Sequence, residues 1–394
     1  MGGFIQLVMS PKWKSWFRLM PAGEVTVPTA SDRSEPSLWE VLLMLAMMFV
    51  LHLWTICRVS SFWDLAAAWF DNPGYLDVVT VIRNWHFSGM EMPWHFWGFP
   101  YAIAGISKLF SVPELVALVT ISMLGSLAVC VLVHRLYGGW VAAVFIFINF
   151  EWMQLSVEGG SEPLFMCLLY ASFLAARSSR WNLAALLASL STTVRPVGVF
   201  ALLCYAVVLA RRRSYRKLAA ITLIGLAIGV LYVVPVWMIL GSPFGNFVGY
   251  RDCWGTHRWP LTYPFSAWVS SYLLALYGNT RWYMLVFFAV WPVVALAGTV
   301  AIWLPGNRQR FSAMYQPEAL FASMYTLFFL SYTDAALDVV LSRFLIPVLP
   351  LLLFSLRDWI PRNRRVLWGG AVVSALLSSA ALVHFKNVFG FRLP

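Results

Sequence analysis

Charged residues are scarce in this chain. They make up 11% of its 394 residues, while hydrophobic residues make up 60%; ordinary soluble domains carry about 25% charged residues. Apolar runs recur along nearly the whole chain, and several reach the roughly 17–25 residues that cross a hydrocarbon core about 30 Å thick. The composition therefore argues against a soluble domain and predicts an all-α, polytopic integral membrane protein.

Acidic residues are fewer than basic ones. The sequence has 17 Asp and Glu against 28 Lys and Arg, which gives a formal net charge of +11. A nucleic-acid-binding protein would need a basic face on a soluble module, but here the basic residues sit in short loops between apolar runs. Sorting of positive charge to the cytoplasmic side of a membrane explains the excess better. We therefore expect membrane lipids, and no nucleic acid, as partners.

Metal-ligand patterns are missing as well. The five cysteines are scattered without a Cys-x-x-Cys pair, and no Asp-x-Asp element occurs. Neither a zinc site nor a disulfide framework is indicated. His86, His95 and His257 lie in loops without metal-ligand spacing, so packing at the membrane interface is the expected role of each. We expect no metal ion and no cofactor.

The N-terminal segment carries no secretion signal. Lys12, Lys14 and Arg18 are followed by a polar stretch, without an apolar core and a small-residue cleavage site. We predict a cytoplasmic tail over 1–37, an uncleaved first span after it, and a single transmembrane domain over 38–394.

The apolar runs predict about 11 transmembrane or re-entrant helices. They lie near residues 39–57, 113–134, 138–155, 163–178, 181–193, 197–210, 217–240, 283–304, 317–333, 342–356 and 366–385. The segments 181–193 and 197–210 are too short to span comfortably and meet at Arg195-Pro196. We expect a bent or re-entrant pair there.

The loops divide by charge between two sides. With the N-terminus cytoplasmic, that side receives basic loops such as 211–217, and the opposite side receives most of the acidic residues. The outer side also receives the two longest loops, 58–112 and 241–282, which are rich in aromatic residues. Long loops without clear secondary structure are usually functional, although any single Trp is also explained as an anchor at the membrane interface.

The segment Asp71-Asn72-Pro73 is the most informative part of the first outer loop. Asp71 and Asn72 can cap a helix that has Pro73 in its first turn, and the apolar positions that follow would lay this helix along the membrane surface. A carboxylate at the outer membrane boundary is also suited to accept a proton from a hydroxyl group. Asp71 is thus either a structural cap or a general base, and Asp64 is the second candidate base.

Charged residues also fall inside or beside later apolar runs. Ser161 is a plausible N-cap with Pro163 in the first turn, so Glu162 either complements the helix dipole or belongs to a site. Arg195 lies between two short apolar segments, where an ionisable residue is costly and a functional role is the default hypothesis.

Arg343 lies near Asp334 and Asp338 in the sequence. A structural salt bridge to one of these residues therefore competes with phosphate binding as its role.

The order of these features resembles the GT-C superfamily of integral membrane glycosyltransferases, which use polyprenyl-phosphate-linked sugars. The first outer loop of that superfamily carries an Asp-(Glu/x)-x-x-Tyr element, then a surface helix, a Gly and a Pro-bearing segment. Residues 71–75, Gly89, Pro93 and Phe99-Pro100 fit this order. Asn72 departs from the acidic second position of many members, which argues against a metal site made of two carboxylates there.

Three later segments extend the resemblance over roughly residues 60–355. Residues 160–165 resemble the Ser-Glu-x-Leu-Phe start of a mid-chain helix, residues 193–198 an Arg-Pro-x-Gly bend, and residues 342–350 a late Arg-(Tyr/Phe)-x-x-Pro-x-x-Pro helix. Residues 240–244, followed by Trp254-Gly255 and Pro260, are most similar to the second GPI mannosyltransferase (PIG-V-like) family and its bacterial relatives. The specificity lies in the order and membrane side of these short pieces.

The resemblance implies a GT-C-type fold and inverting transfer of a hexose, mannose in first place. The donor would be a polyprenyl-phosphate sugar and the acceptor a lipid-linked or surface glycan on the extracytoplasmic side, with Asp71 as general base and a cation stabilising the leaving phosphate. The implied site residues are Asp71, Asp64 and Glu162 for catalysis, and Tyr75, Arg195, Arg343, Arg251, Arg258 and Trp254 for substrate binding.

Two other classes stay open. A secondary transporter or lipid flippase would also be polytopic and basic, with charges beside broken helices, and a non-catalytic membrane subunit would scaffold a partner. No internal repeat is evident, and the candidate residues gather in long outer loops, which favours an enzyme. The compact loops favour a bacterial inner membrane over the endoplasmic reticulum membrane of a eukaryote.

Overall fold

The regular structure of the chain is helical. A computed structural model describes residues 35–59, 61–69, 71–87, 95–246, 282–312, 316–332 and 343–389, with a few single positions between 248 and 273. Across these residues the elements are helices, with one isolated β-bridge between Leu261 and Tyr332. The prediction of an all-α fold is confirmed. The predicted tail 1–37 and second outer loop 241–282 lie largely outside the described residues.

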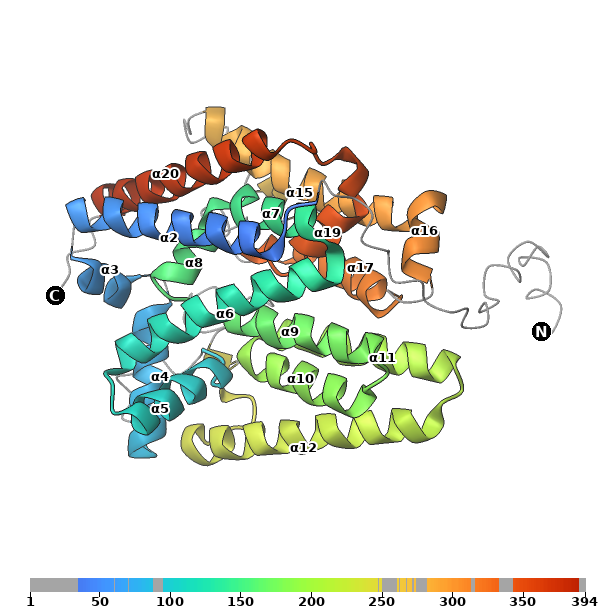
Figure 1. The fold of residues 1–394 in the computed structure, drawn as a ribbon. Coiled ribbons are helices and arrows are strands. Elements are labelled where there is room, and N and C mark those ends of the chain that lie inside the picture. The colour runs from blue at the N-terminus through green and yellow to red at the C-terminus, as the bar shows by residue number, and fades with distance from the viewer. Residues whose placement is uncertain are drawn as a thin grey trace.

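The helices share one bundle, shown in Figure 1. In chain order they are α2 (Leu38–Val59), α3 (Phe62–Ala68), α4 (Asn72–Asn84), α5 (Gly98–Phe110), α6 (Glu114–Tyr137), α7 (Gly139–Ile148), α8 (Phe150–Val157), α9 (Glu162–Arg177), α10 (Trp181–Val194), α11 (Val199–Arg211), α12 (Tyr215–Leu240), α15 (Trp282–Trp303), α16 (Pro305–Ser312), α17 (Gln316–Ser331), α19 (Leu349–Ser355) and α20 (Arg364–Phe389). Short 3₁₀ turns occur at Pro196–Gly198 and Arg357–Trp359.

Several helices have the length and apolarity that a membrane crossing requires. In the part of the chain that the structure describes, these are the 4 helices α2, α6, α12 and α20, or up to 5 spans if the bent pair α7–α8 counts as one. The shorter helices α10 and α11 are apolar but have only 14 and 13 residues. The predicted number of about 11 transmembrane or re-entrant helices is therefore not confirmed and stays a prediction.

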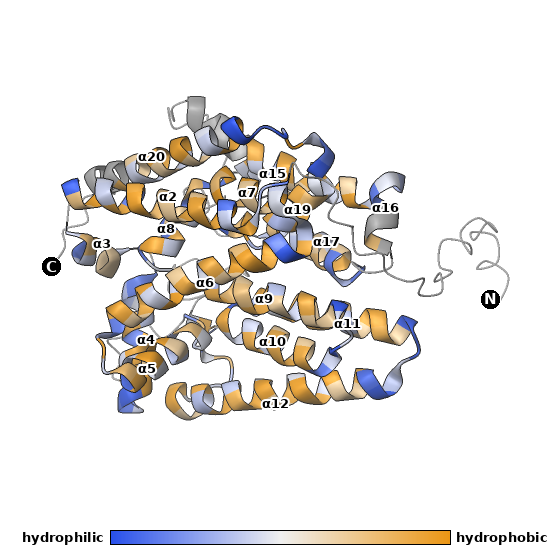
Figure 2. Ribbon diagram, viewed as in Figure 1, coloured by the Kyte–Doolittle hydropathy of each residue, from blue (hydrophilic) through white to orange (hydrophobic). Residues whose placement is uncertain are grey.

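Hydrophilic residues collect toward two opposite ends of the bundle. Figure 2 shows them at the α11–α12 connection and ahead of α20, and again along α3 and α4, with mainly hydrophobic helices between. Near the end that holds the α11–α12 connection, Arg177 donates to the carbonyl of Leu136 at 2.9 Å, and Arg364 pairs with Glu40 at 3.5 Å. The loops around α3 and α4 thus lie at the other end of the bundle from these basic connections, and the assignment of the two ends to two sides of a membrane stays a prediction.

Helix α9 lies in the middle of the bundle. It packs against α6 on one side and α10 on the other, and Phe165, Tyr170 and Phe173 on it are fully buried. Because α9 begins at Glu162, this packing places a carboxylate inside the protein at the α3–α4 end of the bundle.

Two predicted helices are wrong as single elements. The segment 138–155 is split into α7 and α8, which are bent by 82° at Asn149. The Asn149 side chain accepts a hydrogen bond from the Glu151 amide at 2.9 Å, and this cap starts a new helix there. The segment 342–356 is interrupted as well: residues 343–345 are helical, residues 346–348 form a turn, and α19 (Leu349–Ser355) follows, because Pro347 has no amide hydrogen to donate within a helix that runs through it.

The predicted first outer loop, 58–112, contains three helices instead of one. Helix α4 follows Asp71 as predicted, but Tyr75, Val78 and Val79 on it are buried in the protein, with α5 among the helices that it contacts. The apolar face of α4 therefore packs against the protein, and the position of this helix along the membrane surface stays a prediction. Helix α5 was not predicted, since the aromatic residues around it were interpreted as interface anchors.

The predicted break at Arg195-Pro196 is present. Arg195 has an extended backbone (φ −144°, ψ 129°), and the 3₁₀ turn Pro196–Gly198 then leads into α11. Helices α10 and α11 contact each other. Arg195 therefore lies at the break between α10 and α11.

Candidate functional site

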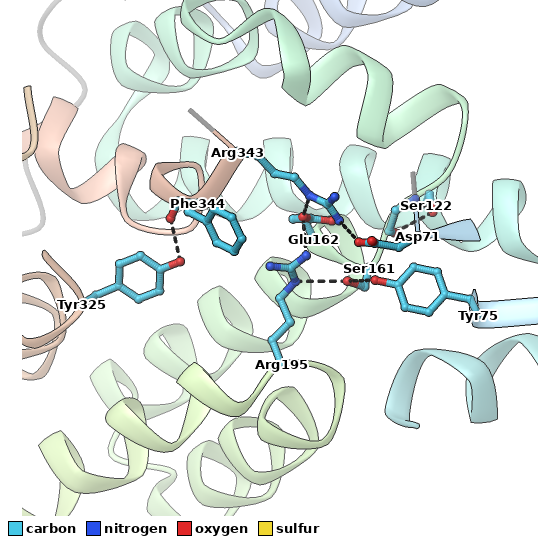
Figure 3. Close-up of polar contacts among 10 residues, drawn as sticks. Asp71, Tyr75, Ser122, Ser161, Glu162, Arg195, Tyr325, Arg343 and Phe344 are labelled. Carbon is cyan, nitrogen blue, oxygen red and sulfur yellow. Dashed lines mark hydrogen bonds and ion pairs between the residues drawn. The ribbon is translucent and has the colours of Figure 1, made fainter. Parts of the chain in front are cut away.

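Asp71 stands at the N-cap position of α4, but its side chain makes no capping hydrogen bond. Its Oδ2 instead accepts a hydrogen bond from Arg343 Nη2 at 2.7 Å (Figure 3). The interpretation of the Asp71 carboxylate as a structural cap is therefore wrong. This carboxylate forms an ion pair with an arginine from a distant part of the chain.

Asn72 is held by two backbone carbonyls. Its Nδ2 donates to the oxygens of Ala66 at 2.7 Å and Glu158 at 2.9 Å, and the residue is buried. An aspartate here would bring a carboxylate against two carbonyl oxygens with nothing to donate. This requirement explains an amide at position 72.

Glu162, the first residue of α9, is completely buried between two arginines. Its Oε1 accepts hydrogen bonds from Arg195 Nη2 and from Arg343 Nε, whereas its Oε2 is buried without a hydrogen-bond partner. Arg343 therefore bridges two carboxylates. We call the group formed by Asp71, Glu162, Arg195 and Arg343 the ionic cluster (Figure 3).

The turn between α8 and α9 sets the position of Glu162. Gly159 has φ +106°, a conformation that glycine adopts without steric cost. The hydroxyl of Ser122 on α6 donates to the carbonyl of Gly160 at 2.8 Å and accepts from its amide at 3.0 Å. Both hydrogen-bonding groups of this buried turn residue are thereby satisfied by one side chain.

A hydroxyl group links α4 to the ionic cluster. Ser161 was predicted to cap α9, and it stands at that position, but its side chain does not cap the helix. Its Oγ instead accepts hydrogen bonds from the Tyr75 hydroxyl at 2.8 Å and from Arg195 Nε at 3.1 Å. Tyr75 thus reaches the cluster through Ser161.

Two buried tyrosines hold the segment that begins at Arg343. The hydroxyl of Tyr325 on α17 donates to the carbonyl of Phe344 at 2.7 Å, and that of Tyr170 on α9 donates to the carbonyl of Pro347 at 2.8 Å. Neither tyrosine was predicted from the sequence as a site residue. The available signal was a tyrosine inside an apolar helix, because a buried hydroxyl usually has a hydrogen-bond partner.

His95 lies next to the ionic cluster. The sequence predicted only packing at the membrane interface for this residue. Its ring packs against Tyr75 with ring centroids 4.8 Å apart and an interplanar angle of 54°. A Cβ atom on Gly74 would overlap this ring. The imidazole therefore occupies space that any larger residue at position 74 would fill.

The cluster is open on the side of Asp71. The side chains of Glu162 and Arg343 are 0% and 7% exposed, and that of Asp71 is 32% exposed. Burial raises the pKa of Asp71, but Arg343, His95 and Arg195 together outweigh it and lower this pKa to about 2. Asp71 is therefore ionised at neutral pH, and it is a weak base while it pairs with Arg343.

The second predicted base, Asp64, does not join the ionic cluster. Asp64 is exposed in the first turn of α3 and forms no ion pair within the described part of the chain. Arg251, Trp254 and Arg258 lie outside the described residues, as do Asp334 and Asp338, the predicted partners of Arg343, and the motif residues Gly89 and Pro93. Over the residues that were placed, no group of three or more His, Cys, Asp or Glu is arranged to hold a metal ion.

No protein-family model, curated protein or solved structure matches this chain. Its chemistry must therefore be inferred from the cluster itself, which combines a partly exposed carboxylate with two guanidinium groups. Such a set can accept a proton from a neutral donor and hold a phosphate or another anion.

Proposed function

We propose that the protein is an integral membrane glycosyltransferase. It moves a hexose, mannose in first place, from a polyprenyl-phosphate donor to a lipid-linked or surface acceptor on the extracytoplasmic side, with inversion at the anomeric carbon. This proposal rests on one observation above the others: Arg343 joins the partly exposed Asp71 to the buried Glu162. A base and a phosphate-binding cation are then adjacent.

In this proposal Asp71 is the general base of a single displacement. The acceptor hydroxyl attacks the anomeric carbon as its proton moves toward Asp71, and the bond from that carbon to the phosphate oxygen breaks. The bonding electrons stay on the lipid phosphate, where Arg343 and Arg195 stabilise the charge. Inversion follows because the hydroxyl approaches opposite the leaving phosphate.

Glu162 would orient both guanidinium groups. It is fully buried, and one of its oxygen atoms accepts from both Arg195 and Arg343. Two cations held this close together repel each other, so an incoming phosphate would gain more from the pair than from either arginine alone. Arg251, Arg258 and Trp254 are proposed as further contacts of the donor.

Donor binding would also change the basicity of Asp71. Its pKa is held at about 2 largely by Arg343. When a phosphate engages Arg343, the hydrogen bond to Asp71 weakens and the pKa of Asp71 rises. The carboxylate would thus become a better base at the moment when the donor is in place.

A transporter or lipid flippase is the second candidate, and one part of the structure favours it. Helices α7 and α8 are bent by 82°, and at the far end of α8 His52 Nε2 lies 2.6 Å from Glu158 Oε1 with both side chains fully buried. Broken helices and ionisable groups inside a membrane are typical of transport pathways.

Reconstitution into liposomes separates the candidates. We expect the purified protein to transfer label from polyprenyl-phosphate [³H]mannose to an acceptor in a membrane extract, and Arg343→Gln to abolish this transfer. Arg177→Gln is the matched control, because Arg177 pairs with the buried Glu318 at 2.8 Å away from the cluster. Movement of the labelled donor across the bilayer without a new glycosidic bond would indicate a flippase. Absence of both activities would indicate a scaffolding subunit.

A further inference from the structure

An imidazole shares one face of α4 with the proposed base. Asp71, Gly74 and Tyr75 are three and four residues apart, so they lie on the same side of the helix. The ring of His95 rests over Gly74 and against Tyr75. It is therefore placed on the face of α4 that carries Asp71.

The segment that carries His95 is held in place by contacts with α12 and with the residues that follow α12. The side chain of the buried Asn246 donates to the His95 carbonyl at 2.9 Å. The Trp97 amide donates to the hydroxyl of Tyr232 at 3.3 Å, and Phe96 stacks on the same Tyr232 ring. Contacts on three successive residues hold the imidazole in place without using the ring itself.

Burial and the charges around the ring set the pKa of His95. The charged groups that face it are Asp71 and Asp77 from α4, Arg195 from the α10–α11 break, and Arg343 from the helical residues 343–345. Burial is the largest effect and lowers the pKa of His95 below its usual value of 6.5, although Asp71 opposes it. The ring is thus neutral at pH 7 and can accept a proton there.

Asp71 by contrast cannot keep a proton at neutral pH while its pKa is near 2. Even when donor binding raises this pKa, the proton has to leave the carboxylate before the next turnover. The neutral imidazole of His95 lies on the same face of α4 and can take this proton.

We propose that His95 is the final proton acceptor of the transfer reaction. This inference rests on the proposed glycosyltransferase function and deepens it. The O–H bond of the acceptor breaks, its oxygen bonds to the anomeric carbon, and the phosphate leaves with the electrons of its C–O bond. The proton passes from the hydroxyl to Asp71 and then to a ring nitrogen of His95, which forms an imidazolium flanked by the Asp71 and Asp77 carboxylates and later loses the proton to water.

The test compares the pH–rate profile of transfer from polyprenyl-phosphate [³H]mannose for the unaltered protein, His95→Gln and His86→Gln. His86 is exposed at the end of α4 and serves as the control. We expect the unaltered protein and His86→Gln to lose rate as the pH falls through the pKa of His95, which burial holds below its usual value of 6.5. His95→Gln should be slower by about 100-fold at pH 7.5, and its remaining rate should lack that acid limb.

A second variant covers the possibility that the ring only supports the fold. We expect added imidazole to restore part of the rate of His95→Ala, because a free base can replace a missing proton acceptor but cannot replace a packing contact. An acid limb that persists in His95→Gln, or a slow His95→Ala that imidazole does not rescue, would overturn the role of His95 alone. Absence of transfer by the unaltered protein at every pH would overturn the proposed function and this inference with it.

Discussion

Arg343 Nη2 donates to Asp71 Oδ2 at 2.7 Å, although the two residues are 272 positions apart in the chain. The same guanidinium group also donates to the buried Glu162. One arginine therefore connects the start of α4 with the start of α9. Breaking a buried pair by removing one partner leaves an uncompensated charge, so the three side chains depend on one another.

Asp71→Asn should slow glycosyl transfer by at least about 100-fold, because the amide cannot accept the proton of the attacking hydroxyl. The protein should stay folded, since the amide oxygen can still accept the hydrogen bond from Arg343. Initial rates and thermal unfolding in detergent test both parts. A variant with the normal rate would remove Asp71 from the mechanism, and the same substitution at Asp64 would then test the second candidate base.

Stability should depend on pH through the Asp71–Arg343 pair. The pKa of Asp71 is lowered from 3.8 to about 2 in the folded protein. The pair therefore stabilises the fold above about pH 4, and this contribution is lost as the pH falls through the interval from 4 to 2. Between pH 6 and pH 3 the melting temperature of the unaltered protein should fall further than that of Asp71→Asn. Equal falls would show that the pair does not persist in solution.

Arg195 should contribute to donor binding. Arg195→Met should weaken binding of polyprenyl-phosphate mannose, and Arg195→Lys should retain part of it, because lysine binds phosphate as a point charge. Breaking the buried pair with Glu162 should also cost about 3–5 kcal/mol of stability. Donor affinity is measured by titration and stability by thermal unfolding.

Arg177→Met is the matched control for Arg195→Met. It breaks the pair with Glu318, which is also buried and has an N–O distance of 2.8 Å. Both variants should lose stability, but only Arg195→Met should lose donor affinity. Equal donor affinities in the two variants would assign Arg195 a purely structural role.

The two ends of the bundle should lie on opposite sides of a membrane. In a cysteine-free background, Asn84→Cys at the end of α4 should react with an impermeant thiol reagent in intact cells, and Ser214→Cys should not. Both positions suit the test, since Asn84 is exposed and Ser214 makes no side-chain capping hydrogen bond. Reversed labelling would place the ionic cluster on the cytoplasmic side.

Some properties of this protein follow from the sequence alone, because they depend on neighbouring residues. A long apolar run predicts a helix wherever it packs, and α2, α6, α12 and α20 begin and end within a few residues of the predicted segments. Proline acts locally too, so the break at Arg195-Pro196 was predictable. Asp71, Glu162, Arg195 and Arg343 could be selected one by one because charges are rare in such a chain.

Only the tertiary structure decided how these residues act on one another. Asp71 and Ser161 occupy the predicted cap positions, but their side chains bind Arg343, Tyr75 and Arg195 instead of capping. The partner of Arg343 was sought among nearby acids, and His95 was assigned to packing, because a pairing across hundreds of residues leaves no local pattern. Which helix ends meet depends on how whole helices pack, and burying an arginine inside the bundle requires that packing to bring it a carboxylate.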